Sequence, residues 1–246
     1  MKHAIFIWPV ASLLVFGCAK PAKQAPSLVA KVYGTQIVEQ SGGKQAAGVG
    51  GKLNDPIVVQ VNGADGNAAV GALVSFHGEG MGFMPSQALT DDNGQVSTVA
   101  QLGGIPGNYM VVAETPKSGG GAASVNLREV ALGYQEKAGK QISEKYCTMC
   151  HDPESTPERV SNFDNLAPPQ PHLFSDGSVL NGMSDSDLTK IIADGGPALG
   201  KSAQTPAYRA TLTPAEIKAV VAYIRAISDP PYQRYPAPFT DRPGPR

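Results

Sequence analysis

The sequence predicts two domains, an all-β sandwich followed by an all-α domain. The chain has 246 residues, which is more than a typical single domain and enough to bury two modest cores. Short β-rich runs separated by Gly, Asn and Asp fill residues 28–130, whereas apolar residues at helical spacing fill residues 131–229. The 28 glycines and 21 prolines also favour turns and extended connections over long surface helices.

The first 17 residues are typical of a signal peptide. Lys2 gives a basic start, and the apolar run over 4–16 is too short for a bilayer-spanning helix of about 20 residues. Residues 15–18, Val-Phe-Gly-Cys, resemble the lipobox of bacterial lipoproteins, which implies that Cys18 is lipidated. An ordinary cleaved signal or an uncleaved anchor is the alternative. We expect a lipid-anchored protein of the cell envelope that faces the periplasm, with 18–27 as a flexible tether, and the choice of membrane stays open.

Five β-rich runs are expected to form the sandwich, because each is short and is bounded by turn residues. They are Ile57–Val61, Val70–Phe76, Gln95–Ala100, Tyr109–Ala113 and Ala123–Leu127. The stretches 64–67 and 91–94 contain Asp-Gly and Asn-Gly pairs, which accept the positive φ of hairpin turns. The glycine-rich segment 78–84 lacks the lysine and the following helix of a phosphate-binding loop, so we expect a surface loop there.

Residues 28–130 resemble the bacterial Ig-like domain group 1 of invasins and intimins. The resemblance is carried by Gly50 to Phe76, with Leu53-Asn54-Asp55-Pro56 and Gly71-Ala72-Leu73-Val74, and it continues through Thr90 to Gln95 and Gly107 to Tyr109. It implies an immunoglobulin-like sandwich that acts as a spacer or docking module and brings no catalytic residue. An adhesive unit, with the second domain as a passenger, is an alternative.

Three helices are predicted in residues 131–229, over 134–146, 184–193 and 214–227. Gly139 lies beside the apolar face of the first helix. A glycine inside a helix costs about 1 kcal/mol relative to alanine, so we expect a packing contact there, such as a close helix crossing. Ser184 is the expected N-cap of the second helix and Gly195 its stop. Thr213 and Glu216 form a capping box at the start of the third.

The first of these helices runs into Cys147-Thr148-Met149-Cys150-His151, a Cys-x-x-Cys-His motif. Two thiols at this spacing can form thioethers to the two vinyl groups of one haem, and the following histidine offers its imidazole to the iron. A redox dithiol or half of a zinc site is the alternative. A zinc site is disfavoured because the mature chain has no second cysteine pair beside Cys147 and Cys150. We therefore expect one covalent haem c.

Residues 131–229 resemble the class I cytochrome c family in the order helix, Cys-x-x-Cys-His, long loop, helix, loop, helix. The resemblance implies that His151 is the proximal iron ligand and that the first and last helices cross near Gly139 and Tyr223. In that family the proline carbonyl of a Pro-x-Leu turn accepts a hydrogen bond from the proximal histidine. Pro171-His172-Leu173 matches this turn, so Pro171 and Leu173 are expected to orient the imidazole.

The sixth iron ligand departs from the family. Gly195 to Ser202 and Pro206-Ala207-Tyr208 follow the family closely, but the residue before this Pro-Ala-Tyr, normally methionine, is Thr205. A hydroxyl is a poor ligand for haem iron, so the distal position could be empty, filled by water or taken by another side chain. The candidates are Met183, His172, His77, Met81, Met84, Lys201 and Gln204. We expect a weakly ligated haem of lower potential than a His/Met cytochrome.

The function favoured by these features is single-electron transfer, with no catalytic residue. The alternative is a haem enzyme or a sensor of a gas or peroxide that uses an open distal site, as Thr205 suggests. The expected partners are a redox protein and, through the lipid anchor, a membrane. Lys and Arg number 20 against 21 Asp and Glu, so no basic field indicates nucleic acid. The proline-rich tail, 230–246, is expected to be extended.

Overall fold

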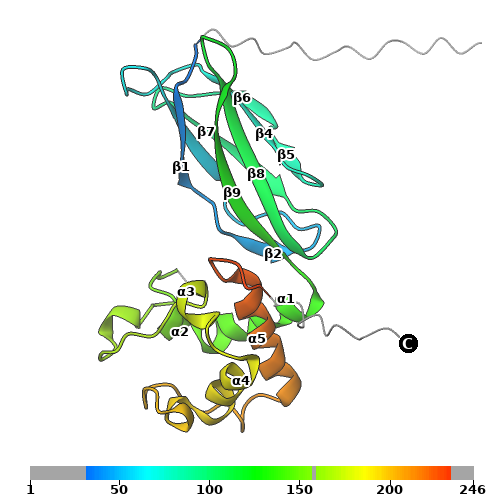
Figure 1. Cartoon of the computed structure of the whole chain (residues 1–246), viewed down its shortest axis with the longest axis vertical. Coiled ribbons are helices and arrows are strands. Elements are labelled where there is room, and N and C mark those ends of the chain that lie inside the picture. Colours follow the sequence, from blue (N-terminus) through cyan, green and yellow to red (C-terminus); the bar gives the residue numbers. More distant parts are fainter. Residues whose placement is uncertain (1–31, 157–158, 234–246) are drawn as a thin grey trace, which may run out of the picture.

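The computed structural model describes residues 32–156 and 159–233. The predicted signal peptide, Cys18 and the tether lie outside these residues, as do residues 234–246 of the tail. A β-rich part is stacked end-on against a helical part, and the chain enters the β-rich part at the end far from the helices (Figure 1). Within the described ranges no helix is long and apolar enough to cross a membrane.

The β-rich part is a sandwich of two sheets. One sheet has the strand order β1-β3-β7-β5 and the other the order β2-β9-β8-β4-β6. The strands are β1 (Gln36–Ser41), β2 (Ala46–Gly48), β3 (Ile57–Asn62), β4 (Leu73–His77), β5 (Gly82–Met84), β6 (Gln87–Leu89), β7 (Gln95–Gln101), β8 (Gly107–Pro116) and β9 (Ala122–Leu132). Their pairings are antiparallel except that of β2 with β9, which is parallel.

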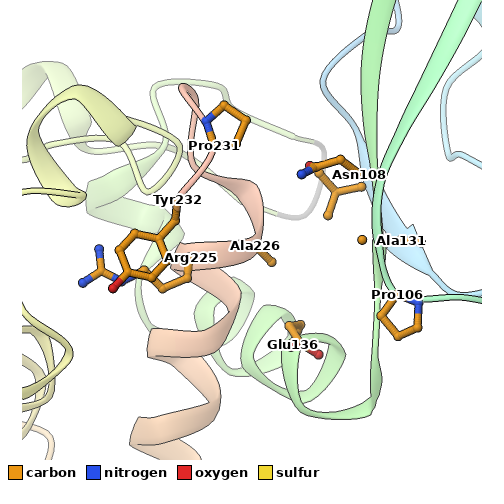
Figure 2. A pocket seen from close by; sticks show the side chains of 10 residues that line it. Pro106, Asn108, Ala131, Glu136, Arg225, Ala226, Pro231 and Tyr232 are labelled. Carbon is orange, nitrogen blue, oxygen red and sulfur yellow. The ribbon is translucent and has the colours of Figure 1, made fainter. Parts of the chain in front are cut away.

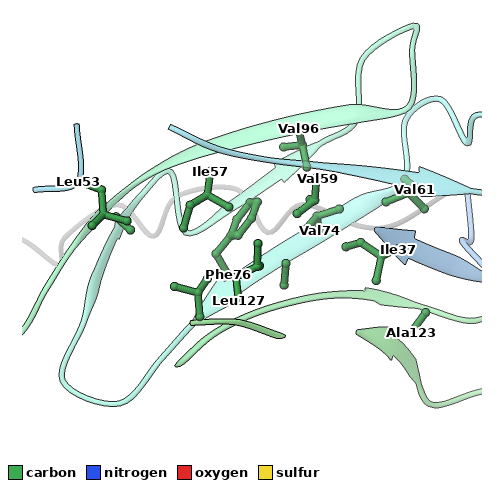
Figure 3. Packing of buried hydrophobic residues seen from close by; sticks show 14 of the residues in the cluster. Ile37, Leu53, Ile57, Val59, Val61, Val74, Phe76, Val96, Ala123 and Leu127 are labelled. Atoms are coloured by element: carbon green, nitrogen blue, oxygen red, sulfur yellow. The ribbon is translucent and has the colours of Figure 1, made fainter. Parts of the chain in front are cut away.

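The sandwich core follows from residue alternation along the strands. Ile57, Val59 and Val61 of β3 are fully buried, and the residues between them are only half-buried. Val74 and Phe76 of β4, in the opposite sheet, pack into the same cluster (Figure 3). Successive side chains of a strand point to opposite faces, so each sheet turns one apolar face inward. Removal of this apolar surface from water holds the two sheets together.

All five predicted runs form strands, but the prediction was incomplete. β4 begins at Leu73 rather than Val70, and β8 and β9 are several residues longer than predicted. The four strands β1, β2, β5 and β6 were not predicted, and β5 lies in the segment 78–84 that was expected to be a loop. Three of these four have only three residues, which is too short to show an alternating pattern. They form because neighbouring strands offer unpaired backbone groups.

The predicted turn at 91–94 has the expected geometry. Gly94 has a φ of +70°, and a Cβ there would lie 2.8 Å from the carbonyl oxygen of Val61. The side-chain oxygen Oδ1 of Asp91 accepts from the backbone N–H groups of Asn93 and Gln95, each at 2.9 Å. Only glycine satisfies both the left-handed conformation and the close approach at this position.

The helical part contains α1 (Tyr134–Tyr146), α2 (Thr148–His151), η1 (Phe163–Asn165), α3 (Gly177–Leu180), α4 (Asp185–Asp194), η2 (Gly196–Leu199) and α5 (Pro214–Ile227). The bounds of α1 and α5 are those predicted, and the caps at Ser184 and Thr213 are both present. The expectation of an all-α domain was too simple, because two short 3-10 helices and long irregular segments separate the α-helices. Pro168, Pro169 and Pro171 explain one of these segments, since proline cannot donate a helical hydrogen bond.

Helices α1 and α5 cross at Gly139, as the sequence predicted. A Cβ at Gly139 would lie 2.5 Å from the carbonyl carbon of Ala219 and 2.9 Å from Cβ of Tyr223. These contacts leave no room for a side chain. The crossing brings Val220, Val221 and Ile224 of α5 into the core of the helical part. The crossing thereby fixes the direction of α1 and so the position of Cys147, which follows its last residue.

Candidate haem site

The Cys-x-x-Cys-His motif lies in one continuous turn of chain. Cys147 closes α1, where its backbone N–H donates to the carbonyl of Ser143 at 2.8 Å, and it also begins α2. The backbone N–H groups of Cys150 and His151 both donate to the carbonyl of Cys147 at 3.0 Å. Helical spacing therefore sets the two thiols and the imidazole on one short segment. The two cysteines form no disulfide with each other.

The thiol of Cys147 has an environment unlike that of a redox dithiol. Burial raises its pKa to about 11, and the neighbouring Cys150 acts in the same direction. Cysteines that exchange disulfides have a lowered pKa, because the thiolate is the nucleophile. The raised pKa of Cys147 is thus opposite in direction to that of a redox cysteine.

The imidazole of His151 is oriented by a backbone carbonyl. Its Nδ1 donates a hydrogen bond to the carbonyl oxygen of His172 at 2.7 Å, which leaves the lone pair of Nε2 available. The ring of Phe174 packs against the imidazole, with 4.5 Å between ring centroids. Burial lowers the pKa of His151, so the ring is held in the neutral form that a metal ligand needs.

The acceptor of this hydrogen bond is His172, not Pro171 as the Pro-x-Leu resemblance implied. Residues 171–173 belong to no helix, strand or turn. Successive carbonyls of an extended chain point to opposite sides, so only one of two neighbouring carbonyls can face the imidazole. The Pro-x-Leu segment therefore orients His151 as expected, but through the carbonyl one residue further along. Leu173 lines the same cavity as His151.

Two residues that sequence reasoning did not single out support the motif. Phe174 supplies the ring against His151. Arg159 ties the following loop back, with Nη1 donating to the carbonyl of Thr148 at 3.1 Å and Nη2 forming an ion pair with Asp152 at 2.9 Å. An aromatic residue directly after the Pro-x-Leu turn was a usable signal for Phe174. No local pattern indicated Arg159.

Thr205 lies in a compact loop after α4. The backbone N–H of Gly196 donates to the carbonyl of Thr205 at 3.1 Å, and the N–H of Thr205 donates to the carbonyl of Ser202 at 3.3 Å. Gly195, at the end of α4, has a φ of +83° that starts the loop. The path of the loop is therefore fixed by backbone hydrogen bonds, and it carries Thr205 at the position where the resemblance led us to expect methionine.

Two other candidate ligands, Met183 and His172, make contacts that do not involve an iron position. Met183 packs against the cluster of Leu180, Leu188 and Val220, as a residue just before an N-cap often does. The ring of His172 faces Asp176 at 3.2 Å, and its own carbonyl holds the Nδ1 side of His151. His172 is thus on the proximal side.

Five further candidates come from other parts of the chain. Met81 packs against the sandwich core, and Met84 is 77% exposed on β5. His77 is exposed at the end of β4, and Gln204 donates to the carbonyl of Ala167 at 3.0 Å. None of these contacts joins a candidate side chain to the motif. Lys201 is exposed in the loop after η2.

The donor set fits covalent haem. Cys147 and Cys150 supply two free sulfurs one turn apart, and His151 supplies an oriented neutral nitrogen. Among residues 32–156 and 159–233, no group of three or more His, Cys, Asp or Glu side chains gathers in the manner of a metal site.

Comparison with known proteins agrees with this assignment for the helical part. Residues 135–224 match the family model described as cytochrome c oxidase, cbb3-type, subunit III. The helical part therefore carries a cytochrome c domain, and such a domain implies haem binding. A search of curated proteins finds no match.

Solved structures similar to the β-rich part include bacterial adhesins. The D0-D1 domain of intimin has a TM-score of 0.29 at 20% identity over 41% of this chain, and the chain spans about half (49%) of that fragment. Invasin, a bacterial integrin-binding protein, has a TM-score of 0.27 at 22% identity over 39% of this chain and 19% of its own. Adhesin InvE of Yersinia pseudotuberculosis has a TM-score of 0.26 at 13% identity over 41% of this chain and 32% of its own. The two-sheet sandwich is described by the strand orders β1-β3-β7-β5 and β2-β9-β8-β4-β6 and does not depend on these comparisons.

Proposed function

We propose that the chain is a mono-haem c-type cytochrome that transfers single electrons in the bacterial cell envelope. The observation that carries the proposal is the hydrogen bond from His151 Nδ1 to the carbonyl of His172, which leaves Nε2 as the free nitrogen of a ring that directly follows two free thiols in the chain. Haem bound there supplies an iron that changes its charge by one electron.

The residues of the motif have distinct roles in this proposal. Cys147 and Cys150 tether the group by thioethers, and His151 is its proximal ligand. The carbonyl of His172 fixes the ring orientation and increases the basicity of Nε2. Phe174 packs on the imidazole and limits its access to water. No substrate bond has to be broken, so electron transfer needs no acid or base at the site.

The surroundings of the cytochrome are also part of the proposal. Lipidation of Cys18 would anchor the chain to a membrane on the periplasmic side, and an Ig-like sandwich would act as a spacer or docking module. The expected partner is a redox protein. The apolar stretch before Cys18 supports this location.

Mass analysis of protein matured in a host able to attach haem tests the proposal. The tryptic peptide 146–159 should carry the mass of one haem, and the double variant Cys147→Ala/Cys150→Ala should lose it. Cys18→Ser is the matched control, because it removes the third cysteine and should abolish lipid but leave the haem in place. A wild-type peptide without added haem would refute the proposal.

Thr205 favours a second candidate, a haem enzyme or a sensor of a gas or peroxide with an open distal position. Thr205 stands at the sequence position where the resemblance to class I cytochrome c led us to expect methionine, and a hydroxyl is a poor ligand for haem iron. Carbon monoxide added to the reduced protein separates the two functions. Rapid, tight binding supports the open site, and absence of binding supports a six-coordinate electron carrier.

A further inference from the structure

The sandwich and the cytochrome part are joined by a polar interface. Arg128 of β9 donates from Nη2 to the carbonyls of Ile227, at 3.4 Å, and Ser228, at 2.9 Å, at the end of α5. The last carbonyls of a helix have no partner within the helix, and a cation is favoured beside them. Arg128 of one part therefore caps a helix of the other.

Two lysines connect the same surfaces. Lys44, before β2, forms an ion pair with Asp229 at 2.9 Å, and Lys140 of α1 donates to the carbonyl of Ala46 in β2 at 2.7 Å. Contacts of β2 and β9 with α1 and of β9 with α5 complete the interface. The sandwich is thus attached to both crossing helices.

These cations line a cavity that reaches the haem ligand. The cavity is about 430 Å³, and the sandwich contributes Lys44 and Arg128 to its wall. The cytochrome part contributes His151, Leu173 and Phe174, the residues of the proximal side. The interface therefore covers the proximal side of the site. The loop that carries Thr205, between α4 and α5, lies away from the sandwich (Figure 1).

A second cavity, of about 240 Å³, also lies between the sandwich and the cytochrome part, and Figure 2 shows side chains that line it. Asn108 lines it, and Asn108 Oδ1 accepts from Nη1 of Arg128 at 2.8 Å. Arg128 therefore spans the interface between the two cavities. Arg225 also lines this second cavity, but its guanidinium is paired with Asp185.

Arg128 differs from the neighbouring lysines in that its charge has no carboxylate as a hydrogen-bond partner in the part of the chain that the structure describes. Lys44 is paired with Asp229, and Lys140 lies 3.9 Å from Glu144. The hydrogen bonds of Arg128 within the described residues all end on neutral oxygens, one amide and two carbonyls. Two carboxylates line the same cavity, but Asp229 is paired with Lys44 and Asp152 with Arg159. The half-buried guanidinium of Arg128 therefore adds a positive charge to the cavity wall.

We propose that the sandwich forms the outer wall of the proximal haem side and that Arg128 is a positioning residue whose charge favours the reduced state. This inference rests on the proposed function. Reduction adds one negative charge to the haem, and a fixed positive charge stabilises the reduced form more than the oxidised form. The sandwich would then raise the proportion of reduced haem, in addition to holding the cytochrome away from the membrane.

Redox titration of the full-length, haem-loaded chain tests the inference, with the ratio of reduced to oxidised haem read at one fixed ambient potential. In Arg128→Gln the ratio should fall about ten- to twentyfold, the effect of one unit charge across a cavity of this size at the effective dielectric of a protein surface. Lys190→Gln is the matched control, because it removes one exposed positive charge from α4, outside the cavity. It should change the ratio much less.

Arg128→Lys separates charge from hydrogen bonding, because it keeps the charge and loses the guanidinium geometry. Its ratio should stay close to the wild-type value. Equal ratios in Arg128→Gln and Lys190→Gln, or an equal fall in Arg128→Lys and Arg128→Gln, would overturn the inference. Lys44→Gln serves if Arg128→Gln does not fold, because it leaves the carboxylate of Asp229 unpaired in the same cavity and so also makes the cavity wall more negative by one charge. The ratio should fall there too, and an unchanged ratio contradicts the inference. A wild-type chain without haem refutes the proposed function instead.

Discussion

Gly139→Ala is the most direct test of the helical fold. The new methyl group would lie 2.5 Å from the carbonyl carbon of Ala219 and 2.9 Å from Cβ of Tyr223. The backbone of α5 cannot move at this point without moving the whole helix. The two helices would therefore separate, and the packing of Val220, Val221 and Ile224 would loosen.

The expected net effect is a loss of about 2 kcal/mol in the free energy of unfolding. Overpacking of a core typically costs about 1–3 kcal/mol, and a contact with backbone belongs at the upper end of that range. Alanine is a better helix former than glycine by about 1 kcal/mol, which offsets part of the cost. The difference gives the net value.

Urea unfolding followed by the haem absorption of the loaded protein measures this effect in the helical part alone. Gly104→Ala is the control, because a Cβ there would meet no atom within 4 Å and the φ of Gly104 is not positive. Its midpoint should match the wild type. If Gly139→Ala were as stable as the wild type or more so, helix propensity would outweigh the clash and the close crossing would be refuted.

Three further changes have defined outcomes. Thr205→Met should introduce a sulfur-to-iron charge-transfer band in the ferric spectrum and reduce carbon monoxide binding, and an unchanged spectrum would mean that the loop does not face the iron. Burial raises the pKa of Glu129 from 4.5 to about 7. The unfolded chain therefore releases this proton at lower pH than the folded chain, and wild-type stability should fall as pH rises from about 4.5 to about 7. Glu129→Gln should remove that slope in urea unfolding at pH 5 and pH 8, and a slope of the same size in both proteins would contradict the assignment. Arg225→Gln, whose guanidinium is buried and bonds a carboxylate and two carbonyls, should cost about 2–3 kcal/mol in thermal unfolding. Arg209→Gln, which breaks an exposed pair with Asp194, should cost less than about 1 kcal/mol.

Local signals account for what could be predicted from the sequence. The bounds of α1 and α5 follow from apolar spacing and, at α5, from a capping box, which both act within a few residues. The cost of a helical glycine indicated a close contact at Gly139, and the resemblance to class I cytochrome c implied that the partner there is the last helix. The Cys-x-x-Cys-His motif is likewise complete within one turn.

Features that depend on distant partners could not be predicted. β2 has three small residues and forms a strand because Val130 to Leu132 of β9 lie beside it. The acceptor for His151 moved by one residue because the path of the chain near His172, and not the Pro-x-Leu pattern, decides which carbonyl faces the ring. The contact of Arg128 with Ser228 joins residues 100 positions apart, and no sequence period covers that separation.

The junction between strand and helix has a consequence for the phase of α1. β9 ends at Leu132 and α1 begins at Tyr134, so Gly133 alone connects them. Each residue of an α-helix advances the azimuth by about 100°, so one inserted residue at this junction would rotate the side of α1 that bears Lys140 away from Ala46. Insertions of different length at Gly133 would thus rotate α1 by different angles about its axis. Only insertions that add close to a whole number of helical turns would return Lys140 to Ala46 and restore the contact with the sandwich.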